Sequence, residues 1–277
     1  MRGLQKSRSI DSLLKETENL VENGIKEIIL ISQDLTTYGW DLRNNGNGTI
    51  KIHNLVRELS QVKGVEWIRL MYAHPSHITE ELTSIVQSEE NVCNYIDMPI
   101  QHISDRILKS MRRGSDGSRI RKLLSDIRRK NSEISLRTSI IVGYPGESED
   151  EFQELYDFIE EAEFERLGVF TYSHEENTPA IFLEDDVSKE LKTERMDKIM
   201  LLQQEISHRK NVDMIGNTYK VLIDEYNEDK GYSIGRSYKD APEVDNRVVI
   251  DEKLNAGSFI NVRIISASAY DVQGELV

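Results

Sequence analysis

Apolar and polar positions follow two different periods along the chain. As far as residue 174, short β-branched apolar runs alternate with segments whose apolar residues recur every three or four positions. Such runs are typical of buried strands, and such segments are typical of amphipathic helices. From Thr218 onward, apolar residues recur at about every second position, which is typical of half-buried strands. The pattern therefore predicts two units of different fold class.

The first unit alternates between strand and helix. Helices are expected at 9–22, 52–62, 78–88, 105–113, 119–130 and 148–162. Strands are expected at 26–31, 66–72, 94–100, 136–142 and 167–171. Consecutive strands that are separated by helices lie parallel and are joined by right-handed crossovers. The expected fold class is therefore α/β, an open, partial TIM-type (β/α) barrel.

The second unit follows one long helix, expected at 188–214. Five apolar positions of this helix are placed to pack back on the first unit: Leu191, Met196, Ile199, Leu202 and Ile206. Five short strands are expected beyond it, at 219–224, 233–238, 248–250, 259–267 and 271–276. So many short strands in so few residues predict a small antiparallel β-barrel. The predicted domains are 1–187, a connecting helix at 188–215, and 216–277.

The stretch 136–151 joins a strand to a helix through a glycine-rich turn, with the sequence LRTSIIVGYPGESEDE. Gly143 and Gly146 flank Pro145 and allow backbone angles that are closed to other residues. Ser148, followed three residues later by Glu151, forms a capping-box pattern for the next helix. Backbone groups at such a turn approach a flat or anionic ligand closely. An ordinary tight turn between strand and helix is the alternative interpretation.

Polar residues follow each of the five strands of the first unit. They are Gln33-Asp34, His74, Gln101-His102, the segment 143–147 and the segment 172–174. Ligands of parallel barrels bind at the carboxyl ends of the strands. Loops are polar in general, but five polar strand ends in succession favour a binding site there.

Composition excludes several classes of protein. Among 277 residues there is a single cysteine, Cys93, so the chain has no internal disulfide and no CxxC metal motif. No apolar run approaches the roughly 20 residues of a membrane span, and no signal peptide is visible, so we expect a cytoplasmic location and no membrane partner. The formal net charge of −14 disfavours non-specific attraction to nucleic acid and favours a basic protein partner.

Several segments resemble one family in their order and spacing. They are 97–102 (DMPIQH), 108–114 (LKSMRRG), 141–147 (IVGYPGE), 235–245 (GRSYKDAPEVD) and 270–276 (YDVQGEL). The first three are similar to the methylthiotransferase branch of the radical S-adenosylmethionine enzymes. The last two are similar to the TRAM domain that closes those proteins. The resemblance covers nearly the whole chain.

The resemblance implies S-adenosyl-L-methionine as cofactor and assigns roles to strand-end residues. Asp34 would pair with the cofactor's ammonium group, with Gln33 beside it, although a helix-capping role for Asp34 is the alternative. Arg137 would form a fork to the cofactor carboxylate, and its alternative is a surface ion pair. Gln101 would contact the ribose, with a loop hydrogen bond as the alternative.

The adenine would lie on the other side of the barrel opening that the carboxyl ends of the strands surround, called here the mouth. Backbone groups of Val142 and Gly143 would contact its edge, and Tyr172 would line the same pocket unless it is a core aromatic residue. His74 and His102 would shape the mouth for the substrate. Cys93 is expected to be a small buried residue.

The family's CxxxCxxC motif is absent from this chain. Arg2-Gly3 and 7–9 (SRS) match the segment that follows the motif in the family, so the chain is expected to be truncated at its amino end. Three thiolates hold the family's 4Fe–4S cluster. One cysteine cannot do this, so the chain alone is expected to hold no cluster and to be inactive.

Three functions remain open on the sequence alone. Gln33-Asp34 and Gln101-His102 are most similar to the branch that modifies the β-carbon of an aspartate in ribosomal protein S12. A tRNA adenosine methylthiotransferase is the second hypothesis, and a non-catalytic module that binds RNA or protein is the third. From residue 216 onward there are seven basic and eleven acidic residues, a net charge of −4. An acidic domain suits a basic ribosomal protein better than tRNA.

Overall fold

The computed structural model describes residues 5–42, 50–176 and 178–277. The matching pair Arg2-Gly3 lies outside these residues. Twenty helical, 3-10 and strand elements follow one another along the described chain, in the order that the two periods predict.

Five parallel strands form the first unit, as predicted. They are β1 (Glu27–Leu30), β2 (Trp67–Leu70), β3 (Tyr95–Asp97), β4 (Ser135–Val142) and β5 (Arg166–Thr171). β1 pairs with β2, and β3, β4 and β5 pair in that order, every pair parallel. An isolated bridge between Ile68 and Val92 joins the two groups. The strands therefore follow one another around an open arc that begins at β1.

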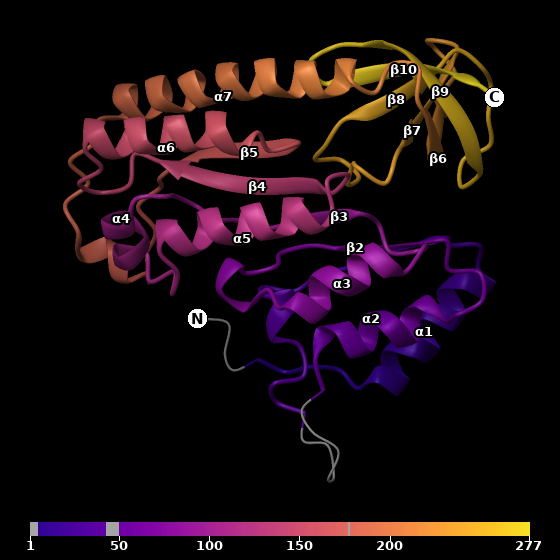
Figure 1. The fold of residues 1–277 in the computed structure, drawn as a ribbon, viewed down its shortest axis with the longest axis horizontal. Coiled ribbons are helices and arrows are strands. Elements are labelled where there is room, and N and C mark those ends of the chain that lie inside the picture. The colour runs from indigo at the N-terminus through magenta and orange to yellow at the C-terminus, as the bar shows by residue number, and fades with distance from the viewer. Residues whose placement is uncertain (1–4, 43–49, 177) are drawn as a thin grey trace.

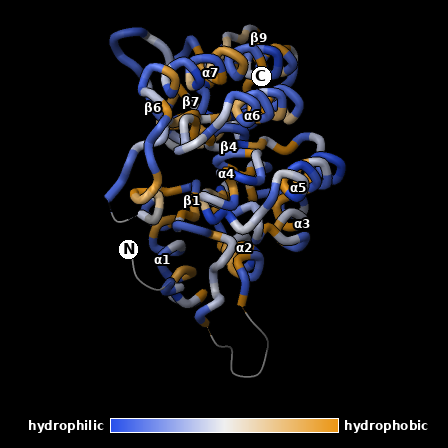
Figure 2. The backbone as a smooth tube through the Cα atoms, turned by 90° about the vertical axis from the view of Figure 1, so that its left-hand side faces the viewer, coloured by the Kyte–Doolittle hydropathy of each residue, from blue (hydrophilic) through white to orange (hydrophobic). Residues whose placement is uncertain are grey.

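Helices cover the outer face of this arc (Figure 1). They are α1 (Ile10–Glu22), α2 (Ile52–Ser60), α3 (Glu80–Ser88), α4 (Asp105–Ser110), α5 (Gly117–Lys130) and α6 (Glu149–Ala162). Three 3-10 turns, η1 (Leu35–Thr37), η2 (Pro75–His77) and η3 (Pro179–Phe182), lie in the connections. The tube in Figure 2 alternates between hydrophobic and hydrophilic along the helices, as expected of elements with one buried face. The predicted capping box is present: Ser148 Oγ accepts the Glu151 amide at 3.2 Å.

The long helix α7 (Lys189–Val212) belongs to the core of the first unit as well as linking it to the second. Ile199, Leu202 and Ile206 are buried in the same apolar cluster as the strands of the arc. Figure 1 shows α7 running over α6 and β5 toward the second unit. The expectation that its apolar face packs back on the barrel is confirmed for these three residues.

The second unit is a closed barrel of five strands. They are β6 (Thr218–Asn227), β7 (Tyr232–Arg236), β8 (Arg247–Ile250), β9 (Phe259–Ala267) and β10 (Asp271–Leu276), in the order β10-β8-β7-β6-β9. One correction is needed, because β10 pairs parallel with β8. A ring with an odd number of strands cannot alternate direction at every pair, so closure itself requires a parallel pair.

The two units meet through buried charges at the end of the arc opposite the carboxyl ends of its strands. Arg69 on β2, fully buried, donates to Glu27 on β1 and to the carbonyl of Tyr238 in the second unit, both at 2.8 Å. Arg236 on β7 donates to the other oxygen of Glu27 at 2.7 Å and also pairs with Asp224. Burial alone would raise the pKa of Glu27, but Arg69 and Arg236 outweigh it and hold that pKa below its usual value.

A second set of buried charges joins β3, β4 and the loop after β7. Arg137 donates to Asp97 at 2.8 Å and to Asp245 at 3.2 Å. Tyr95 donates its hydroxyl to the second oxygen of Asp245 at 2.8 Å. Arg166 on β5 pairs with Asp240 at 2.6 Å. The segment 235–245, which carried the resemblance to a TRAM domain, therefore supplies the TRAM side of these buried ion pairs with the barrel.

Removal of one charge from this network should be costly. Arg137→Met leaves the buried carboxylates of Asp97 and Asp245 without their cation, so we expect a loss of about 3–5 kcal/mol in the free energy of unfolding. Urea denaturation followed by circular dichroism measures it. Arg263→Met is the matched control, since Arg263 pairs with Glu275 at the surface and should lose less than about 1 kcal/mol. Equal losses in the two variants would contradict the role of the network.

Candidate active site

The carboxyl ends of the five strands form the mouth of the open arc. Along β1 a cleft of about 820 Å³ leads to this mouth. It is lined on one side by α1 and the residues before it, and on the other by 28–35, including Gln33 and Asp34. Within the described chain, β1 pairs on one edge with β2 and the cleft follows its other edge. The mouth is thus reached from the side where the arc is open.

Asp34, His74 and His77 form a first cluster, called here the β1–β2 cluster. One ligand-type atom from each lies within 4.8 Å of the others. Asp34 Oδ1 accepts the Thr36 amide at 3.0 Å and also the Thr36 hydroxyl, so Asp34 does cap η1. Its Oδ2 lies 2.8 Å from His77 Nδ1. The capping role leaves one carboxylate oxygen directed at the histidines.

His74 is held in the same cluster by the turn that it begins. Its Nδ1 accepts the Ser76 amide at 3.2 Å, and Pro75 starts η2 behind it. Its ring centroid lies 5.0 Å from that of His77. Burial, and to a lesser extent the nearby charge of Arg113, lower the pKa of His74 to about 4. The ring is therefore neutral at pH 7.

Arg113 is a site residue that the sequence analysis missed. One of its terminal nitrogens donates to the Pro99 carbonyl at 2.6 Å, and within the described residues its buried Nε has no partner. Burial lowers its pKa, whereas the charge of Asp34 raises it. A carboxylate and a guanidinium are the groups that pair with the ammonium and carboxylate ends of an amino acid.

The turn after β4 forms the second part of the mouth. Gly143 has φ +70° and Gly146 has φ +75°, as predicted for positions closed to other residues. Glu147 returns its carboxylate to the Gly143 amide, which lies 2.9 Å from Oε2. The other oxygen, Oε1, accepts from Arg195 of α7 at 2.7 Å. Glu147 is therefore a buried clamp that fixes the turn against α7.

Glu147 has a direct consequence for the predicted adenine contacts. The Gly143 amide already donates to Glu147, so it has no free hydrogen for a ligand. The Val142 carbonyl accepts the Tyr172 amide at 2.8 Å and keeps its second lone pair. Of these two groups, the Gly143 amide and the Val142 carbonyl, only the Val142 carbonyl keeps hydrogen-bonding capacity for a ligand.

Tyr172 lies against this turn. Its ring centroid is 5.2 Å from that of Tyr144, and Lys192 Nζ is 5.1 Å from the ring. Its hydroxyl is buried and has no partner among the described residues, and burial raises its pKa. A hydroxyl that is buried without a partner is costly unless a ligand or water satisfies it.

Two further residues lie between these groups. Gln101 has φ +72° and bonds through its backbone to β4, with its amide 2.9 Å from the Ser139 carbonyl. His102 is fully buried, with Nδ1 accepting the Ser104 amide and Nε2 3.5 Å from Glu147. His102 therefore supports the turn and does not line the mouth, contrary to expectation.

The predicted roles of Arg137 and Gln33 need separate comment. The expected fork from Arg137 to a cofactor carboxylate does not fit the structure, because its guanidinium is already engaged by Asp97 and Asp245. The ion pair that was the alternative is present, but it is buried. Gln33 is exposed beside Asp34 at the mouth.

The chain's own residues do not fit an iron–sulfur cluster. The single cysteine, Cys93, is buried beside β2, and burial raises the pKa of its thiol to about 11. A cluster ligand has to be a thiolate, and three are needed.

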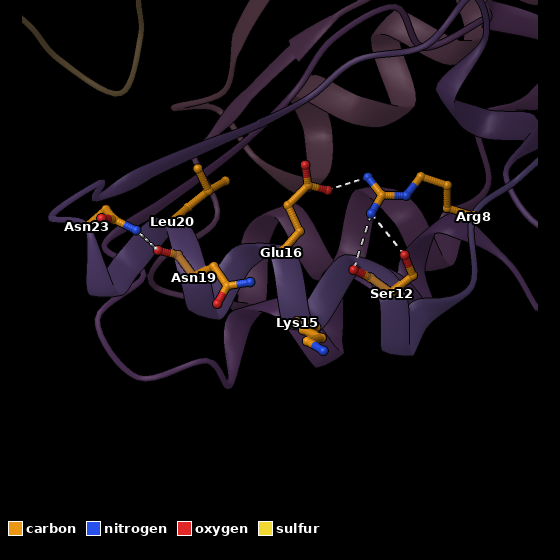
Figure 3. Close-up of a pocket in the computed structure, with 7 residues that line it drawn as sticks. All are labelled: Arg8, Ser12, Lys15, Glu16, Asn19, Leu20 and Asn23. Atoms are coloured by element: carbon orange, nitrogen blue, oxygen red, sulfur yellow. Dashed lines mark hydrogen bonds and ion pairs between the residues drawn. The ribbon is translucent and has the colours of Figure 1, made fainter.

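A second hollow lies along the exposed face of α1 and is separate from the mouth. Figure 3 shows Glu16 and Ser12 bonded to Arg8 at one end and Asn19 bonded to Asn23 at the other. These polar groups pair with one another, so the hollow has the character of an ordinary helix surface.

Comparison with known proteins now identifies the family. The Radical SAM superfamily matches residues 1–159, and the TRAM domain matches residues 215–277. The chain belongs to the Radical SAM superfamily. Its fold agrees, because coproporphyrinogen III oxidase from Escherichia coli, a radical SAM enzyme, superposes with a TM-score of 0.52 at 17% identity over 71% of this chain and 46% of that one.

Two curated relatives match over both units. Both are named ribosomal protein uS12 methylthiotransferase RimO. The protein from Christiangramia forsetii is 48% identical over 99% of this chain, and that from Alkaliphilus oremlandii is 44% identical over all of it. The matches span 60% and 63% of these relatives, so the chain covers about three fifths of their length. Within the described residues, no helix is long and apolar enough to cross a membrane.

Some of the missed residues had a signal in the sequence. Glu147 follows Gly143 by four positions, which lets a carboxylate turn back to the amide at the end of a strand. His77 follows His74 across a proline, and this spacing places both rings on one short turn. Arg113 lies in the segment 108–114 that carries the family resemblance, but the sequence does not show that its side chain reaches the mouth, which depends on how the chain packs after α4.

The turn after β4 should tolerate no side chain at Gly143. A Cβ there would lie 2.2 Å from Lys192 Cγ, whereas Gly231, with φ +75°, has nothing within 4 Å. Gly231→Ala should lose about 1 kcal/mol from its backbone angle alone, and Gly143→Ala should lose a further 1–3 kcal/mol or so from overpacking. Thermal and urea unfolding of both variants measure the difference. Equal losses would mean that α7 does not press on the turn.

Proposed function

We propose that this chain is the barrel and TRAM part of a radical SAM methylthiotransferase that modifies ribosomal protein uS12. Its target would be the β-carbon of an aspartate, as the family resemblance implies. The observation that carries the proposal is the identity of 44–48% to two proteins of that name, over 99–100% of this chain and across both units. A shared barrel alone would suggest only the superfamily.

We place S-adenosyl-L-methionine at the mouth of the arc. Asp34 would bind its ammonium group, and Arg113 would bind its carboxylate in place of Arg137. Gln101 would face the ribose, while the Val142 carbonyl and Tyr172 would face the adenine. The unpartnered Nε of Arg113 and the unpartnered hydroxyl of Tyr172 support this placement, because a bound ligand would satisfy both.

When bound, the cofactor supplies methyl groups and the radical that activates the target carbon. The protein's part is to bind and orient. Glu147 and Arg195 hold the adenine side rigid, and the cap on η1 holds Asp34 in one rotamer. A 4Fe–4S cluster is part of the family's chemistry, but this chain's residues do not hold it, and we expect its ligands in the part of the relatives that the chain does not span.

The charge of the TRAM domain favours a basic protein over tRNA. Asp224, Asp240 and Asp245 are already paired with arginines. Glu228 and Asp229, at the tip of the β6–β7 hairpin, are exposed. A hairpin with exposed carboxylates attracts a cationic ribosomal protein and repels phosphates.

The proposal is tested by completing the enzyme. The part of the Christiangramia forsetii relative that lies outside the match is joined to this chain, and the chimera is expressed in a bacterium that lacks its own uS12 methylthiotransferase. Mass spectrometry should show uS12 with one added methylthio group. Methylthio groups on tRNA instead of uS12 would favour the tRNA-modifying alternative. A chimera that carries its cluster but modifies neither would favour a non-catalytic module.

Asp34 should contribute charge to cofactor binding. Asp34→Asn keeps the oxygen that caps η1 but removes the negative charge, and a charged hydrogen bond is worth about 1.5–3 kcal/mol. The cofactor should therefore bind the chimera roughly ten- to a hundredfold more weakly by calorimetric titration. Asp41→Asn is the control, because Asp41 is an exposed carboxylate in the same loop. The same affinity in wild type and Asp34→Asn would exclude Asp34 from the cofactor site.

A further inference from the structure

The β1–β2 cluster has a composition that cofactor binding does not explain. Binding of an ammonium group needs the carboxylate of Asp34 but neither imidazole. His74 and His77 nevertheless lie beside it, each with one ring nitrogen in a group of donors within 4.8 Å of one another. Two imidazoles and one carboxylate are a common ligand set for divalent transition metals.

We propose that Asp34, His74 and His77 bind one divalent ion of the zinc, cobalt or nickel class, with the remaining coordination positions open to solvent. Imidazole nitrogen suits these ions, whereas Mg²⁺ and Ca²⁺ prefer sites made of oxygen. This goes beyond the proposed function and does not depend on it, since the two share only Asp34.

The present geometry lies close to what a metal ion requires. Donors at about 2.1 Å from a tetrahedral ion lie roughly 3.4 Å apart. The Asp34 and His77 donors, 2.8 Å apart, would open slightly. The widest pair in the cluster would close by at most about 1.4 Å. Small rotations of the partly exposed Asp34 and His77 side chains, without a change of rotamer, supply such a change.

Surrounding contacts hold Asp34 and His77 in place. Thr36 binds one oxygen of Asp34 through both its amide and its hydroxyl, which leaves the other oxygen directed at His77. Trp40 meets the His77 ring edge-on, with centroids 4.9 Å apart. Hydrogen bonds and packing that orient the ligands in this way are typical of metal sites.

Metal binding costs little in existing hydrogen bonds. The Ser76 amide donates to His74 Nδ1 at 3.2 Å. This long bond is lost if Nδ1 binds the ion. It is also lost if Nε2 binds the ion, because the ring proton then moves to Nδ1, which can no longer accept. If His77 binds the ion through Nδ1, it loses its hydrogen bond to Asp34, and the ion then links the same two side chains. Both histidines would bind the ion as neutral rings.

The test uses the 277-residue chain without cofactor, freed of metal by a chelator. Co²⁺ is titrated and followed by its visible absorption, and Zn²⁺ is titrated by calorimetry, with Mg²⁺ as a comparison. We expect one Co²⁺ or Zn²⁺ per chain and no Mg²⁺. His77→Gln and Asp34→Asn should each weaken binding by roughly a hundredfold or more, because loss of a supporting contact alone costs 10–100-fold.

His208→Gln is the matched control, since His208 is an exposed histidine on α7. It should bind Co²⁺ and Zn²⁺ as the wild type does. The proposal is overturned if the wild type binds neither ion, if His77→Gln binds like the wild type, or if His208→Gln weakens binding equally. Circular dichroism melts confirm that each variant is folded. Because no cofactor is present, the result is independent of the test of cofactor binding.

Discussion

The buried charges between the barrel and the TRAM domain are the constraint on which the rest of the structure depends. An open arc of five strands leaves its inner face uncovered at the end away from the mouth. The TRAM domain covers that end with Arg236 and Asp245, which pair with Glu27 and Arg137 inside the arc. Apolar residues of equal volume would have avoided the desolvation penalty. Paired charges, however, fit in one register only, so they fix how the second unit docks.

This division leaves the other end of the arc for ligands. At the end that the TRAM domain covers, buried arginines and carboxylates pair with one another, whereas the Tyr172 hydroxyl at the mouth has no partner among the described residues. α7 connects the two ends, because it packs on β5 and also supplies Arg195 to the clamp on Glu147.

Local patterns predicted most of the fold, and they failed where partners are distant in sequence. The capping box at Ser148 and Glu151 and the left-handed glycines after β4 depend on neighbouring residues, so they could be predicted. Arg137 could not, because its partner Asp245 lies in the other unit, 108 positions away. The parallel pair of β8 and β10 was missed for a similar reason, since closure of the barrel decides it rather than either strand.

The same limit applies to the mouth. A polar residue after a strand can be recognised in sequence, but its availability to a ligand depends on what the fold already gives it. The Gly143 amide is used by Glu147, whereas Asp34 keeps one oxygen because Thr36 takes only the other. That second oxygen faces both the histidines and the open mouth. A metal ion and an ammonium group are both cations and would both be stabilised by it. The arrangement of the β1–β2 cluster therefore favours a cation. The two imidazoles beside the carboxylate give a metal ion additional donors, which an ammonium group cannot use.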